Sequence, residues 1–233
     1  MILTENLKAS KKQASFWGKV KDVLSYIYEH YIKFPGYILA HPIKGFDYFK
    51  RENKGKMQVA VTFMILLILL QIIAFQYTGF VVNQNKPEDL NTMKEIGLVV
   101  FPILLFTVSN WSVTTLFDGK GKMKEIFMMI CYSLYPMIWT TAIGVIFSNF
   151  ITLDEVGFYG LIIGLGIFLT GYMIFFGLIS IHEYGVLKSI GAIAGTVLAI
   201  LIILFIMLLA FDLLQQIYSF IYTIYREISL RYL

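Results

Sequence analysis

Five long apolar stretches constrain the fold of this chain more than any other feature of its sequence. Each has at least the ~20 residues that an α-helix needs to cross ~30 Å of hydrocarbon, and none carries a charge through its middle. In lipid only helices and closed barrels satisfy their own backbone, and near-continuous apolar runs are not typical of barrel strands. The predicted spans are 57–82, 96–117, 126–147, 158–181 and 190–213.

The predicted fold is therefore all-α, an integral membrane bundle of five transmembrane helices. Only 15% of the residues are charged, whereas soluble domains have about a quarter. We expect a cytoplasmic amphipathic and juxtamembrane segment over 1–56, a membrane domain over 57–213 and an amphipathic tail over 214–233. The tail either forms a helix on the outer surface or against a partner, or extends the fifth span beyond the membrane.

The charges are distributed unevenly between the two sides. Fifteen of the 19 Lys and Arg residues fall in 1–56, in the loop after span two and in the loop after span four, and four fall in the other segments. The positive-inside rule then predicts a cytoplasmic N-terminus, and an odd number of spans predicts an extracellular C-terminus.

The N-terminal segment predicts an amphipathic helix. Apolar residues that include Trp17 recur at helical spacing over 16–33, and a proline predicts the end of the helix near Pro35. Its apolar side fits lipid and a partner protein equally well. The basic cluster before span one, Lys50–Lys56, fits anionic lipid or simple anchoring. No basic groove of the nucleic-acid-binding kind is apparent.

Glycines spaced four apart lie in the last two spans. Gly160 with Gly164, and Gly191 with Gly195, fit the small-xxx-small pattern that lets helices approach closely. We expect span four to pack on span five through these faces, and a docking face for a partner's helices is the alternative.

The sequence offers no catalytic or metal-binding motif. His182-Glu183 lacks a second histidine at the zinc-protease spacing, and Cys131 is the single cysteine. There is no Gly-rich phosphate loop and no nucleophile elbow. We expect a protein that is not an enzyme and has no cofactor.

Several loop strings nevertheless form a recognisable set. They are Asn110-Trp111 through Asp118-Gly119-Lys120-Gly121, then Tyr132 to Pro136, His41-Pro42 with Gly45-Phe46, and His182-Glu183-Tyr184 with Lys188. Together they resemble the bacterial branch of the Yip family (Ypt/Rab-interacting proteins), from about Pro42 to the end of span five. Two interpretations of the loop remain open. Asp118 and Gly119 could form nothing more than a tight hairpin, with Asp118 or Asn110 capping a helix end, or the loop could dock a partner.

The resemblance implies a non-enzymatic, multipass scaffold in a bacterial cell membrane. Its partners would be membrane lipid and other membrane proteins, such as the permease subunits of a carbohydrate ABC importer. A stand-alone transporter or channel is the alternative. It would need a polar path, and the candidate residues for that path are Gln71, Asn110, Tyr132, Tyr135 and Thr140.

Overall fold

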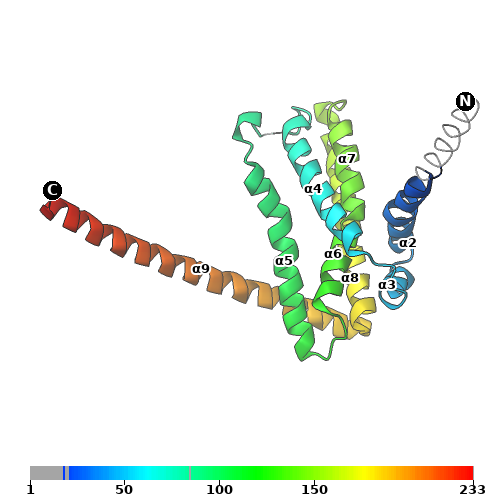
Figure 1. Ribbon diagram of the computed structural model, residues 1–233. Helices are drawn as coiled ribbons and strands as arrows, with labels where there is room; N and C mark the ends of the chain where they lie inside the picture. The colour runs from blue at the N-terminus through cyan, green and yellow to red at the C-terminus, as the bar shows by residue number, and fades with distance from the viewer. Residues whose placement is uncertain (1–17, 19–20, 84, 233) are drawn as a thin grey trace, which may run out of the picture.

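The computed structural model describes residues 18, 21–83 and 85–232, and helices account for nearly all of this part of the chain (Figure 1). Five helical segments are long and apolar enough to cross a membrane, which confirms the predicted all-α fold with five candidate spans. Their bounds are α4 Met57–Tyr77, α5 Thr92–Leu116, α6 Met123–Ser133 with α7 Tyr135–Ser148, α8 Val156–His182 and α9 Val186–Tyr232.

The third span consists of two helices. The break lies at Leu134, two residues ahead of Pro136, which occupies the first turn of α7. A proline has no N–H to offer a preceding carbonyl and its ring crowds that carbonyl, so the chain leaves the α-helical pattern just before it. Pro102, in contrast, lies inside α5 without ending that helix.

The segment ahead of α4 is helical, but its first helix does not end where the sequence predicts. Residues 21–27 are helical, and the chain continues through the π-helical turn η1 Tyr28–Lys33 into α2 Phe34–Ala40 and then α3 Pro42–Arg51. The prediction that the helix ends at Pro35 is wrong. The wider π turn, in which the Phe34 N–H bonds to the Glu29 carbonyl, accommodates the proline ring. The helix ends instead at His41, which adopts a non-helical conformation ahead of Pro42.

Helices α2 and α3 pack on the spans. Phe46 and Phe49 of α3 are buried, and Phe46 lies over Gly177 of α8, where a Cβ would come 3.1 Å from its ring. Tyr132 of α6 is almost fully buried at the centre of three edge-on rings, those of Phe34, Phe49 and Phe63, at 6.2, 5.0 and 5.5 Å. One side chain therefore holds α2, α3 and α4 together.

Helix α9 packs on α5, not along α8. Gly195 lies against Val113 of α5, whereas a Cβ on Gly160, Gly164 or Gly191 would meet nothing within 4 Å. The expectation that span four packs on span five through these glycines is therefore wrong. The close glycine contacts of α8 are instead Gly166 and Gly177, which face α7 and the α3–α6 side.

Thr196 is the last buried residue in the described part of α9, and the rest of the helix runs obliquely away from the bundle as a single helix (Figure 1). The described part of the tail, residues 214–232, continues the helix of the fifth span, so of the two alternatives the structure has the extension. Figure 1 also shows the loops after α5 and α8 at one end of the bundle, near α3. We call this the basic end: residues 41–56, 117–122 and 183–185.

Candidate functional site

Two loops at the basic end turn in the same way. After α5, the Gly119 N–H donates to the Thr114 carbonyl at 2.7 Å, and after α8 the Tyr184 N–H donates to the Ile179 carbonyl at 3.1 Å. In each loop the residue before the donor is acidic and left-handed, Asp118 at φ 55° and Glu183 at φ 56°. This is the pattern of a Schellman helix end, in which glycine is the usual residue. No described glycine has a positive φ, so Asp118, and not the neighbouring Gly119, occupies the left-handed position of the hairpin.

A buried chain of hydrogen bonds joins the two loops. The Gly121 N–H donates to His182 Nδ1 at 3.3 Å, so His182 carries its proton on Nε2 and donates it to Asn110 Oδ1 at 3.1 Å. Asn110 Nδ2 donates to Thr196 Oγ1 at 3.0 Å, and Thr196 donates to the Ala192 carbonyl at 2.7 Å. All these hydrogen bonds donate in the same direction along the series, which connects the α5–α6 loop, α8, α5 and α9. Asn110 is thus buried inside α5, and the suggestion that it caps a helix end is wrong.

Tyr184 contacts both the loop after α5 and the His182 ring. Its hydroxyl donates to the carbonyls of Phe117 and Thr114 at 2.9 and 3.3 Å, and its ring stacks on His182 with 5.3 Å between centroids. A Cβ on Gly119 would come 2.7 Å from His182 Nδ1, and one on Gly121 would come 2.7 Å from His182 Cε1. These glycines are needed for close approach. We call the set Asn110, Gly119, Gly121, His182, Tyr184 and Thr196 the clasp.

A surface ion cluster lies over the clasp. The Glu183 carboxylate contacts Lys120 Nζ at 2.6 Å and Lys50 Nζ at 3.4 Å, and Lys50 also donates to the Ile181 carbonyl at 2.7 Å. The hydrogen bonds from Lys120 and Lys50 hold the pKa of Glu183 below its ordinary value. The cluster links α3 to both loops, and the Lys188 ammonium lies 4.6 Å from the centre of the Tyr184 ring.

The remaining predicted site residues lie apart from the clasp. Trp111 is exposed on the outer side of α5, and His41 is exposed between α2 and α3, where it stacks on Tyr37 at 5.1 Å. Pro42 is buried in the first turn of α3. Trp17 lies outside the described residues. Sequence reasoning missed Thr196 and the pairing of Lys50 and Lys120 with Glu183, since nothing in the sequence pairs positions so far apart.

The polar groups of the clasp are occupied by hydrogen bonds between elements. Both imidazole nitrogens of His182 are engaged, and the Asn110 amide bonds to two other elements. Among the described residues, no three His, Cys, Asp or Glu side chains are placed to hold a metal ion. The clasp therefore fixes where α5, α8 and α9 meet at the basic end, and the ion cluster adds α3 to this junction.

These features define a helical membrane protein in which short helices and loops close one end of a bundle of five candidate spans. The family model of the Yip1 domain matches residues 36–209. That match covers most of the chain, from α2 to the middle of α9, so the chain belongs to the Yip family. No curated protein and no solved structure matches it.

Proposed function

We propose that this protein is a non-enzymatic scaffold of the bacterial branch of the Yip family and resides in the bacterial cell membrane. In this proposal it is an accessory subunit that offers the exposed part of α9 to another membrane protein, such as a permease subunit of a carbohydrate ABC importer. Membership of a membrane protein family supports the setting. The particular role rests on α9.

The observation that carries the proposal is the exposed apolar surface of α9. Residues 205–228 are all exposed, and they include a dense set of large apolar side chains. A helix of 47 residues is roughly 70 Å long, more than twice the ~30 Å of a hydrocarbon core. A single crossing of the hydrocarbon core covers only part of that length. The rest presents Ile217, Phe220, Ile221 and Ile224 at helical spacing, the pattern by which an amphipathic helix docks on another protein.

The test is co-expression with the permease subunits of a carbohydrate importer from the same organism, followed by purification in a mild detergent. We expect the permeases to purify with the full chain in a fixed ratio, and the double variant Ile217→Ser/Phe220→Ser to lose them. The matched control is Leu161→Ser/Phe168→Ser, two exposed apolar residues of α8. If the permeases never co-purify, or if both double variants keep them equally, the proposal is wrong.

The transporter alternative has less support from the geometry. Gln71 lines a polar pocket of about 470 Å³ at the end of the bundle opposite the clasp, together with Asn83 and Glu95. Asn110, Tyr132, Tyr135 and Thr140 are not among the residues that line it. Solute flux into vesicles that contain only this protein would favour the alternative over the scaffold.

A further inference from the structure

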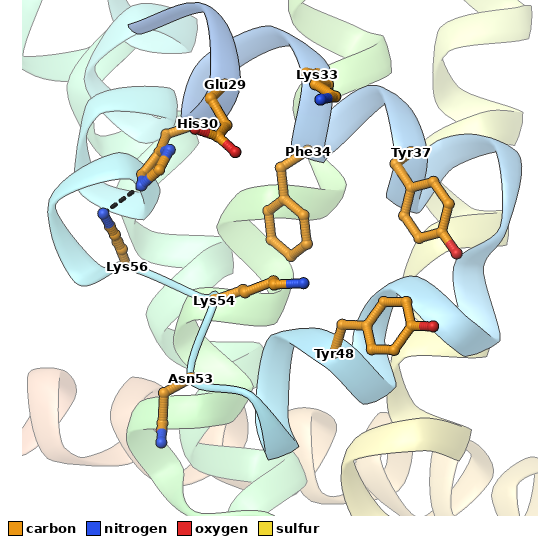
Figure 2. A pocket seen from close by; sticks show the side chains of 9 residues that line it. All are labelled: Glu29, His30, Lys33, Phe34, Tyr37, Tyr48, Asn53, Lys54 and Lys56. Atoms are coloured by element: carbon orange, nitrogen blue, oxygen red, sulfur yellow. Dashed lines mark hydrogen bonds between the residues drawn. The ribbon is translucent and has the colours of Figure 1, made fainter. Parts of the chain in front are cut away.

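A second hollow lies at the basic end, outside the clasp, on the side of α2 and α3. Figure 2 shows the residues that line this groove, which has a volume of about 550 Å³. They come from η1, α2, α3 and the link to α4, and they are Glu29, His30, Lys33, Phe34, Tyr37, Tyr48, Asn53, Lys54 and Lys56.

The charge of the groove is positive. Three lysines line it against one carboxylate, Glu29. Lys33 and Lys56 form no ion pair within the described part of the chain. Lys54 pairs with Glu52 at 2.6 Å, but both side chains are exposed, and an ion pair of this kind contributes little, so that an anionic ligand can replace it. His30 accepts a hydrogen bond from the Lys56 ammonium, so its imidazole is neutral and the ammonium charge remains. Burial and the nearby Lys56 both lower the pKa of His30, in agreement with that assignment.

The groove also has an apolar wall. In Figure 2 the Phe34 ring lies in the middle of the view, with the rings of Tyr37 and Tyr48 to one side and the end of the Lys54 side chain below it. The Lys54 ammonium lies 4.9 Å from the centre of the Tyr48 ring. Cationic groups next to aromatic carbon suit a ligand that is anionic at one end and apolar at the other.

The position of the groove selects a lipid. Lys54 and Lys56 are the last polar residues before α4, the first span, begins at Met57, so the groove lies at the level of the headgroups. The neighbouring helical segment exposes Val23, Ile27 and Ile32, which can enter the same leaflet. We propose that this groove binds one anionic phospholipid, with its phosphate held by Lys33 and Lys54 and its glycerol and upper acyl carbons against Phe34 and Tyr37.

The test measures lipid retention by native mass spectrometry of the full chain in detergent, with phosphatidylglycerol added against phosphatidylcholine. We expect one phosphatidylglycerol per chain, and retention at least about tenfold weaker in Lys33→Gln/Lys54→Gln. The control is Lys44→Gln/Lys124→Gln, which removes the same charge from exposed positions at or near the basic end that do not line the groove. We expect this control to bind as the parent protein does.

Three outcomes would overturn the proposal. The first is equal loss of lipid in both double variants, which would mean general surface attraction. The second is equal retention of the two lipids. The third is that inorganic phosphate or glycerophosphoglycerol, added as the headgroup alone, binds while phosphatidylglycerol does not, which would mean a soluble anion as the ligand. Because the four lysines are exposed, all variants should fold, and matching thermal unfolding curves would verify this.

Discussion

Asn110 is fully buried in α5, and both of its polar atoms bond to other elements. Most hydroxyl groups in the spans bond within their own helix, as Thr107 does with the Ile103 carbonyl and Ser133 with the Met129 carbonyl. Hydrogen bonds within one helix contribute little to the packing of that helix on its neighbours. The amide of Asn110 is different because it determines which way His182 and Thr196 face, so the clasp depends on this one side chain.

The variant Asn110→Ala should therefore lower the free energy of unfolding by about 1–3 kcal/mol, because it leaves His182 Nε2–H without its acceptor in a buried site. Thermal unfolding in detergent measures the loss. Ser112→Ala is the matched control, since the exposed Ser112 hydroxyl bonds only to the Val108 carbonyl of its own helix. A loss no greater than that of the control would contradict the assigned role.

Glu183 gives the basic end a pH dependence. Its pKa is lowered in the folded protein, so its contribution to stability is complete above the unfolded-state pKa and disappears as the pH falls through the folded-state pKa. Glu183→Gln should be less stable than the parent protein at neutral pH, and the difference should shrink as the pH falls below the ordinary pKa of a glutamate. Unfolding temperatures across that range test this. Asp154→Asn, at an exposed carboxylate without an ion pair among the described residues, should show no such trend.

The motif residues of the clasp are visible in the sequence, but their contacts are not. Asn110 and His182 both belong to the strings that resemble the Yip family, yet 72 positions separate them and nothing local pairs them. The left-handed Asp118 and Glu183 are also hidden, because glycine is the residue that normally indicates this conformation. Sequence reasoning therefore located most residues of the candidate site, but it missed Thr196 and the contacts that join the residues.

At the scale of the elements, α7 and α8 share one of the closest helix contacts of the bundle. A Cβ on Gly166 of α8 would come 1.9 Å from Thr140 Oγ1 of α7, and one on Gly144 of α7 would come 2.9 Å from Ile163 Cδ1 of α8. Neither glycine belongs to the pairs singled out by spacing. Spacing identifies a flat helix face, but burial decides whether a neighbour uses it, and Gly160 and Gly164 face open space.

The two kinds of glycine on α8 can be told apart by substitution. Gly166→Ala should push α7 and α8 apart and lower the free energy of unfolding by about 1–3 kcal/mol. Gly164→Ala, two residues away on the same helix, meets nothing within 4 Å and should be neutral or slightly stabilising because alanine favours the helix. Thermal unfolding of both variants in one detergent measures the contrast, and equal effects would contradict the packing of α8 on α7.

At the scale of the whole molecule, hydrophobicity predicted the five spans, because an apolar run of ~20 residues is compatible with few structures other than a membrane-spanning helix. It could not predict that α2 and α3 join the bundle, since Phe46 and Phe49 would look the same on a helix lying free in the headgroups. Nor could it predict the path of α9. The fifth apolar run and the aromatic tail are one helix of 47 residues, and only its first turns pack on α5.

The grouping of the basic loops at one end leads to a prediction about orientation. If the positive-inside rule holds, the basic end faces the cytoplasm, and residues such as Asp154 at the opposite end of the bundle face outward. Cysteines introduced as Lys122→Cys and Asp154→Cys, both at exposed positions, can be labelled with a membrane-impermeant maleimide. The buried Cys131 should give little background. In intact cells Asp154→Cys should react at once and Lys122→Cys only after permeabilisation, and the reverse order would invert the orientation. Thr223→Cys is exposed near the end of α9. If the fifth span crosses the membrane as the other four do, the maleimide should label Thr223→Cys in intact cells, as it labels Asp154→Cys.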